Sequence, residues 1–242
     1  MFEKFFSKFG SQQIAQEDRF FSEIEGYGDL KEIIAKMLVS KESANVILDG
    51  PPASGKTIFL LAIKQNMRNV HYIDGTNASG PGIIEKLFLY PRTQILCIDE
   101  IEKMSKRDQN TLLNLLETGI LTSTKVRKQV ELEFKGIKFF ATTNDIDSIS
   151  KPLRSRLMEF CLPEYTYEEF EKISVKLLAK RNKLNREIAI KIAEVVWTQM
   201  NSKDIRNVLQ LGKIVTSINE VEKTARTLMK YSQANRGSEE EE

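Results

Sequence analysis

The sequence has two cysteines, a single histidine and no long uninterrupted apolar run. Cys97 and Cys161 each lie inside a short apolar run, so we expect both to be buried and reduced. The only histidine, His71, has no second histidine or nearby cysteine to complete a zinc site, and we interpret it as a strand residue without a catalytic role. No run approaches the length of a transmembrane helix, and the N-terminus lacks a signal peptide's apolar core. These absences predict a cytoplasmic protein with no membrane partner.

A strong charge of either sign is also absent. The 36 basic and 34 acidic residues leave a net charge of +2, so any surface that binds nucleic acid must be local. The chain has 242 residues, of which 41% are hydrophobic, and this is enough for one sizeable core and a smaller appended domain.

One stretch fits a specific pattern: residues 50–57 read GPPASGKT, which matches G-x-x-x-x-G-K-[ST], the phosphate-binding loop. Apolar runs flank it, so we predict a strand, a glycine-bounded loop and a helix that begins near Thr57. Gly50 and Gly55 would let backbone N–H groups approach phosphate, and the helix would add the positive end of its dipole. In such a loop Lys56 reaches the β- and γ-phosphates and the Thr57 hydroxyl holds Mg²⁺. The chain is therefore expected to bind a nucleoside triphosphate through Gly50, Pro51, Pro52, Ala53, Ser54, Gly55, Lys56, Thr57 and Ile58.

Two adjacent acids, Asp99 and Glu100, end the apolar run Ile95–Ile98. Acids at the end of a buried strand are unfavourable unless they have a function, and parallel sheets bind ligands at the carboxyl ends of their strands. We expect Asp99 to coordinate Mg²⁺, directly or through water. We expect Glu100 to orient and polarise the attacking water as a general base.

Polar residues also flank the last two strands of the predicted sheet. Asn144 follows the strand Ile137–Ala141, where an amide can hold water or the γ-phosphate by hydrogen bonding. Arg154 and Arg156 precede the strand Met158–Leu162. Two interpretations are open: surface charge, or groups that stabilise the charge on a transferred phosphoryl group.

A predicted helix across Gln109–Thr118 is followed by a segment, Gly119–Gly136, whose β-rich arms surround a basic centre. This pattern predicts a hairpin with a basic tip. The tip is either a solvated loop or a finger that contacts phosphates or a partner protein, and we favour the finger. Its basic residues are Lys125, Arg127 and Lys128.

Two features precede the phosphate loop. Four phenylalanines have the spacing of one helical face: Phe2, Phe5, Phe6 and Phe9. That face either packs on this protein or a neighbouring subunit, or docks on a partner or a membrane surface. Gly26 and Tyr27 lie in a tight turn, which is either a simple connection or a wall for the nucleotide base.

From Pro163 onward the alternation of strands and helices stops. Thr166 and Glu169 form a capping-box pattern, and further amphipathic helices are predicted at about 185–200, 202–217 and 220–233, the last with Asn219 as its N-cap. The expected organisation is an N-terminal amphipathic segment and linker at 1–19, a nucleotide-binding α/β domain at 20–163, a helical domain at 164–233 and an acidic disordered tail at 234–242.

Together these motifs resemble those of the AAA+ ATPases over about residues 20–230. Residues 50–57 match the Walker A motif of that family, and ILCIDE, residues 95–100, matches Walker B. Asn144 resembles sensor 1, Arg156 falls where the family places the arginine finger, and Arg206 resembles sensor 2 of the helical lid. FSEIEGYGDLKE is similar to the segment whose backbone contacts adenine, which favours a nucleotide role for Gly26 and Tyr27.

The resemblance implies a P-loop NTPase fold of the α/β class. Its parallel five-stranded sheet has the order 5-1-4-3-2, is flanked by helices and is followed by a helical lid. The implied activity is hydrolysis of ATP with Mg²⁺ between the subunits of a homo-oligomeric ring, a hexamer.

The spacing of ATTN and SKPLRSRL is similar to that of RuvB-type Holliday-junction motors. Those motors carry a winged-helix domain after the lid, for which this sequence leaves no room. The segment CIDEIEKMSKRDQNTLLNLLETG, residues 97–119, and the basic hairpin that follows it also resemble the minichromosome maintenance helicases. On that resemblance Lys125, Arg127 and Lys128 are the expected contacts for DNA or an accessory protein. The expected function is a DNA motor. A MoxR-type protein-remodelling ATPase, with the Phe-rich N-terminus as an adaptor contact, and a loader-type nucleotide switch are the alternatives.

Overall fold

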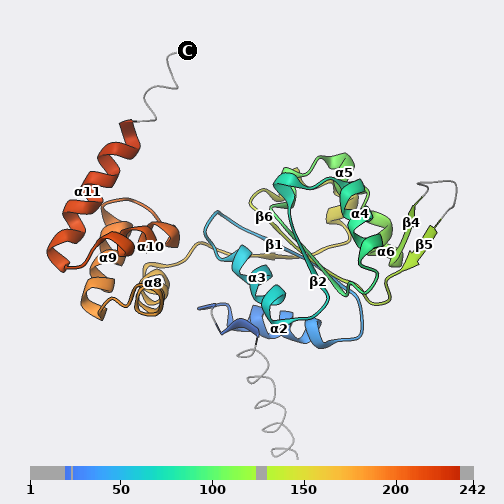
Figure 1. Ribbon diagram of the computed structural model, residues 1–242, viewed down its shortest axis with the longest axis horizontal. Helices are drawn as coiled ribbons and strands as arrows, with labels where there is room; N and C mark the ends of the chain where they lie inside the picture. The colour runs from blue at the N-terminus through green and yellow to red at the C-terminus, as the bar shows by residue number, and fades with distance from the viewer. Residues whose placement is uncertain (1–19, 23, 124–129, 235–242) are drawn as a thin grey trace, which may run out of the picture. The chain divides into compact units, whose positions relative to one another are not determined.

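The computed structural model describes residues 20–22, 24–123 and 130–234 (Figure 1). They form two compact units, and the main boundary between the units lies between Pro163 and Glu164. Within these described ranges, no helix is both long and apolar enough to cross a membrane.

A five-stranded parallel sheet of order β2-β3-β6-β1-β7 forms the centre of the first unit. Its strands are β1 (Ala44–Asp49), β2 (Val70–Asp74), β3 (Ile95–Asp99), β6 (Lys138–Thr143) and β7 (Met158–Cys161). When these five strands are numbered along the chain, the order is 5-1-4-3-2. The predicted fold class and strand order are therefore confirmed.

Helices cover both faces of this sheet (Figure 1). One face is covered by α2 (Gly28–Val39) and α3 (Lys56–Asn66), and the other by α4 (Gly80–Leu89), α5 (Lys106–Asn110) and α6 (Leu113–Thr118). A short 3₁₀ turn follows each of three strands: η1 (Gly75–Asn77) after β2, η2 (Ile101–Lys103) after β3 and η3 (Ile146–Ser148) after β6. A short helix, α7 (Lys151–Arg154), precedes β7.

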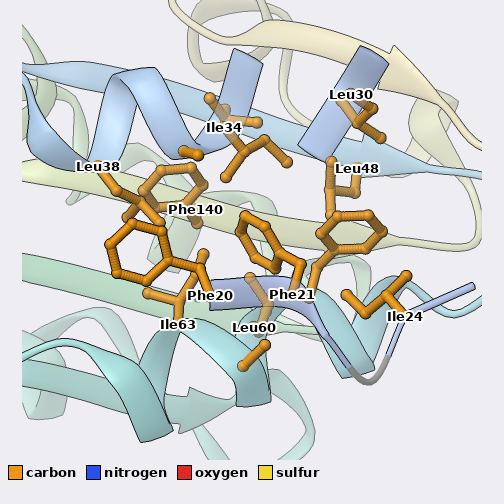
Figure 2. Close-up of a cluster of buried hydrophobic side chains, with 14 of the residues drawn as sticks. Phe20, Phe21, Ile24, Leu30, Ile34, Leu38, Leu48, Leu60, Ile63 and Phe140 are labelled. Carbon is orange, nitrogen blue, oxygen red and sulfur yellow. The ribbon is translucent and has the colours of Figure 1, made fainter. Parts of the chain in front are cut away.

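The three central strands, β1, β3 and β6, are mostly apolar because helices cover both of their faces. In β1, Val46 and Leu48 join the cluster under α2 and α3, whereas Ile47 between them joins the opposite cluster. Figure 2 shows the first cluster, in which Phe21 and Phe140 lie among the side chains of α2, α3 and β1. Fully burying such a side chain contributes about 1.5–3 kcal/mol to the stability of the fold. The two clusters therefore hold the sheet in place, and with it the polar residues at the carboxyl ends of its strands.

The prediction of one continuous helix across Gln109–Thr118 is wrong, because the structure has two helices there, α5 and α6. The Thr111 hydroxyl donates to the carbonyl oxygen of Asp108 (2.6 Å), and the N–H of Leu112 bonds to Gln109, three residues back. A side chain that bonds to the local backbone competes with the helical hydrogen bond, which explains the break.

The two cysteines differ in burial. Cys97 in the central strand β3 is buried as expected, but Cys161 in β7 is exposed, so that part of the prediction is wrong. Because β7 is an edge strand, and three of its four residues are exposed, an apolar run there does not imply burial.

The predicted hairpin is present in its two arms, β4 (Ile120–Ser123) and β5 (Val130–Glu133), which pair antiparallel. Its basic tip, with Lys125, Arg127 and Lys128, lies outside the described residues, as do the N-terminal phenylalanines and the acidic tail.

The second unit is helical, with α8 (Tyr167–Asn182), α9 (Arg186–Thr198), α10 (Ile205–Ile214) and α11 (Ile218–Ala234). The capping box at the start of α8 is confirmed, since Thr166 and Glu169 exchange both hydrogen bonds. Asn219 is not the N-cap of α11, because the helix already begins at Ile218. The carboxylate of Glu220 instead accepts from the backbone N–H and the hydroxyl of Thr216 (both 3.0 Å), and this fixes the earlier start.

Candidate nucleotide-hydrolysis site

Residues 50–55 join β1 to α3 at the carboxyl edge of the sheet. Three of them have positive φ: Gly50 (149°), Ala53 (67°) and Gly55 (90°). Glycine adopts such angles without a steric penalty, whereas a left-handed alanine costs about 1–2 kcal/mol. Strain of this kind concentrates at functional loops, and here it wraps the backbone around the start of α3.

The Lys56 side chain is folded against this loop and is almost fully buried, with 6% exposed. Its Nζ donates to the carbonyl oxygens of Gly50 (2.7 Å) and Pro51 (2.6 Å). Burial lowers the pKa of Lys56, and nearby carboxylates, of which Asp49 and Glu102 have the largest effects, oppose that shift. A phosphate oxygen that binds this ammonium group must compete with the two carbonyls.

Asp99, at the end of β3, is held by three hydroxyl groups from three different elements. Thr57 of α3 donates to Oδ1 (3.1 Å), Thr142 of β6 donates to the same oxygen, and Tyr72 of β2 donates to Oδ2 (2.7 Å). Burial, followed by the bond to Asp99, raises the pKa of Tyr72 well above its usual range. Asp99 is buried but fully hydrogen-bonded, so its position is fixed before any ligand binds.

The oxygen atoms of Thr57 and Asp99 fit Mg²⁺, because this ion prefers oxygen ligands and keeps several waters. Their side chains meet at the start of α3, next to the phosphate-binding loop. Both assignments stay predictions.

Glu100 occupies the left-handed region (φ 50°, ψ 50°) and is half-buried. Its N–H donates to the Thr142 hydroxyl (2.9 Å), and Gly75 of η1 packs against its backbone. A Cβ on Gly75 would lie 2.3 Å from the Glu100 carbonyl oxygen, so only glycine allows this approach. This strained backbone makes the chain turn at Glu100, directly after β3 ends. Strain of this kind concentrates at functional sites, which fits a residue that acts on a ligand there.

Asn144 follows β6 immediately and is exposed. Its backbone N–H and its side-chain Nδ2 both donate to Oε1 of Glu102, at 3.2 and 2.9 Å. Since β6 lies between β3 and β1, Asn144 shares one edge of the sheet with Asp99, Glu100 and the loop. The structure thus brings together four of the predicted site residues: Lys56, Asp99, Glu100 and Asn144.

Arg156, in the turn after α7, lies near the amino ends of β1 and β7, away from the carboxyl ends of the strands. Arg156 donates to Glu117 (3.0 Å) and to the Pro152 carbonyl oxygen (2.8 Å), while Arg154 pairs with Asp147 and Glu159. Arg156 lines a cavity of about 500 Å³ beside the first residues of β1 and β7. The structure therefore separates Arg156 from the phosphate-binding loop of its own chain.

The remaining predicted contacts are placed as follows. Gly26 and Tyr27 both have positive φ (72° and 54°) and form the turn that starts α2, where the Tyr27 hydroxyl donates to the Pro163 carbonyl oxygen (3.2 Å). Arg206, at the start of α10 in the second unit, pairs with Asp204 (2.8 Å). A role in nucleotide binding stays a prediction for all three residues.

Sequence reasoning missed Tyr72, Thr142 and Glu102. Thr142 carried a usable signal, because it is a hydroxyl residue one position before the carboxyl end of a strand, whereas Tyr72 is an ordinary strand residue. Glu102 lies two residues after Glu100, outside the matched motif, and its contact with Asn144 joins residues 42 positions apart.

Three comparisons agree with this arrangement. Residues 46–164 match the family described as "ATPase family associated with various cellular activities (AAA)". The chain is 29% identical over 191 residues to the Holliday junction branch migration complex subunit RuvB of Mycoplasmopsis pulmonis, covering 73% of this chain and 59% of that protein. It is 25% identical over 197 residues to the Lon protease of Protochlamydia amoebophila, covering 72% and 23%.

Among solved structures, a mutant of Thermotoga maritima RuvB is similar with a TM-score of 0.62 and 21% identity. The alignment covers 81% of this chain and 64% of that one, and at this identity it shows the fold alone. The chain thus spans less than two thirds of the RuvB proteins that it matches.

Proposed function

Residues 46–164 form a domain of the AAA ATPase family, and from that premise we propose that the chain hydrolyses ATP in a ring of identical subunits that acts on DNA in the cytoplasm. We expect a hexamer. The observation that carries the hydrolytic part is the meeting of Lys56, Asp99, Glu100 and Asn144 at the carboxyl ends of the strands. Asp99 and Glu100 lie at the end of β3, Asn144 follows the neighbouring strand β6, and Lys56 begins α3, the helix after β1.

Each of these residues has a distinct task. Lys56 binds the β- and γ-phosphates, Glu100 takes a proton from the attacking water, and Asn144 positions that water. Mg²⁺ held by Thr57 and Asp99 would neutralise phosphate charge when bound with the triphosphate. Gly26 and Tyr27 contact the base, and Arg206 of the helical unit responds to the γ-phosphate.

The ring is supported by the place of Arg156. In the register of the sheet, Met158 lies beside Val46, four residues before Gly50. At about 3.3 Å per residue this is about 13 Å along the strand, and Arg156 precedes Met158. An arginine side chain does not extend from there to its own loop, so a phosphate contact by Arg156 requires a second subunit.

Complementation between two inactive variants tests this sharing. Lys56→Ala removes phosphate binding and Arg156→Ala removes the finger, whose loss reduces the rate about 10³–10⁵-fold. When the two are mixed, the intact Arg156 of one subunit completes the intact loop of the other, and ATPase activity returns. Arg154→Ala is the matched control and retains its activity. Two inactive proteins that stay inactive when mixed, or per-subunit turnover that does not fall on dilution, would exclude the shared site.

The DNA part is supported by the similarity to a RuvB subunit and by the hairpin arms β4 and β5, which carry the basic segment. A four-way DNA junction should stimulate the ATPase, and the stimulation should fall as salt is raised from about 50 to 200 mM, as phosphate contacts require. Replacing Lys125, Arg127 and Lys128 with alanine should remove the stimulation but keep the basal rate. Unchanged stimulation in the triple variant would exclude the hairpin contact.

A second candidate is a protein-remodelling ATPase, which the similarity to a Lon protease favours. It requires stimulation by an unfolded polypeptide and none by DNA. Stimulation by neither ligand would favour a loader-type nucleotide switch.

A further inference from the structure

Glu102 in η2 is bonded twice to Asn144, although it stands outside the Walker B sequence. Both donors of Asn144, the backbone N–H and the side-chain amide, go to one oxygen atom, Oε1. A single acceptor therefore fixes the main chain and the side chain of Asn144 together, at the point where β6 ends.

The chemistry of the pair fixes the orientation of the Asn144 amide. An ionised carboxylate accepts hydrogen bonds and donates none, so only the NH₂ end of the amide can face Glu102. The carbonyl end, Oδ1, must point away from Glu102. It is thereby presented as an acceptor at the same sheet edge as Glu100 and Lys56.

The second oxygen of Glu102, Oε2, is buried and has no hydrogen-bond partner among the described residues. A buried polar atom without a partner destabilises a fold. A glutamate that served stability alone would not be placed this way, which favours a role in the site.

We propose that Glu102 is a positioning residue for hydrolysis: it holds the Asn144 amide so that Oδ1 accepts a hydrogen bond from the attacking water. This inference rests on the hydrolytic role proposed for Asn144. The water oxygen forms the new bond to the γ-phosphorus, its proton goes to Glu100, and the electron pair of the broken bond leaves on the ADP oxygen. Glu102 takes no proton and touches no reacting atom.

The test compares steady-state ATPase kinetics of the full chain with Glu102→Ala, Glu102→Gln, Asn144→Ala and the double variant Glu102→Ala/Asn144→Ala. Asn144→Ala should lose about 10²–10³-fold in kcat, as for other groups that act in the transition state. Glu102→Ala should lose about tenfold or more in kcat with little change in KM, a size that coupled neighbours reach. In the double variant the loss should equal that of Asn144→Ala, because Glu102 acts only through Asn144.

Glu102→Gln keeps an acceptor oxygen and should recover most of kcat, to within about threefold. Lys103→Ala, an exposed neighbour in η2, controls for disturbance of this segment. Binding of a fluorescent ATP analogue with unchanged affinity shows that each variant is folded.

The outcomes separate the inference from the function on which it rests. If Asn144→Ala keeps its activity, the proposed role of Asn144 fails, and the inference fails with it. If Asn144→Ala is impaired but Glu102→Ala is not, or if the two losses multiply, only the inference fails. A kcat that rises in Glu102→Ala would also overturn it, since Glu102 would then restrain Asn144. The amide ¹⁵N resonances of Asn144 report the contact without turnover, and Glu102→Ala should shift both its backbone and its side-chain signals.

Discussion

The hydrogen bond between Tyr72 and Asp99 can be tested by removing one oxygen atom. In Tyr72→Phe the ring keeps its packing, but Oδ2 of Asp99 loses its donor at 2.7 Å. A hydrogen bond to a charged group contributes about 1.5–3 kcal/mol, and the lower end applies because Tyr72 is half-buried and water can replace its hydroxyl. For a protein of this size, about 1.5 kcal/mol lowers Tm by about 3–6 °C.

The effect should depend on pH in a defined direction. Burial and the bond to Asp99 raise the pKa of Tyr72 above its ordinary value. A group whose pKa is raised by folding contributes stability below its unfolded pKa, here about 10, and this contribution is lost as the pH rises toward the folded pKa. The difference in unfolding free energy between wild type and Tyr72→Phe should therefore be largest below about pH 10 and shrink above it.

Thermal unfolding followed by circular dichroism measures the shift, with Tyr90→Phe as the matched control. Tyr90 is 54% exposed, and its ring packs edge-on against His71 with the ring centroids 4.6 Å apart, so loss of its hydroxyl should leave Tm unchanged. In the Asp99→Ala background, Tyr72→Phe should have almost no further effect, since the acceptor is already gone. The same Tm loss with and without Asp99 would refute the hydrogen bond as the cause.

Two further perturbations probe the same strand ends. Gly75→Ala places a Cβ 2.3 Å from the Glu100 carbonyl oxygen and should displace this general base. As a result, kcat should fall by about tenfold or more while the affinity for ATP is retained. An unchanged kcat would show that η1 moves without displacing Glu100. Thiol titration at about pH 8 should detect one reactive cysteine per native chain and two after denaturation, because burial raises the pKa of Cys97 to about 12 while Cys161 is exposed. Cys161→Ser should abolish the native reaction, and a remaining fast thiol would contradict the burial of Cys97.

The parallel sheet could be predicted from the sequence because its central strands are covered on both faces. Such strands are short continuous apolar runs, as at Ile95–Ile98, and polar residues directly after them mark the carboxyl ends of the strands. The glycine-bounded loop could be predicted because the chemistry of a phosphate site requires its residue types at fixed spacing. Within β3 and β6, therefore, local sequence and tertiary environment agree.

The features that could not be predicted depend on contacts between distant elements. Cys161 lies in an apolar run, but its exposure follows from the edge position of β7, which the run itself does not encode. The start of α11 depends on the Glu220 carboxylate reaching back to Thr216, which competes with the cap expected at Asn219. Tyr72 is a usual strand residue, and only the register of β2 beside β3 brings its hydroxyl to Asp99.

Thr142 joins these contacts into one unit, because its hydroxyl serves both acids at the end of β3. It donates to Oδ1 of Asp99 and accepts from the N–H of Glu100. Two residues further along the chain, Asn144 is bonded to Glu102. The end of β6 is therefore tied to β3 and the turn after it at three points, and neither strand end can shift without breaking a bond to an acid. Asp99 keeps its place through three donors, whereas Glu100 is held at this edge through its backbone, which leaves its carboxylate as the group that can adjust to a bound water.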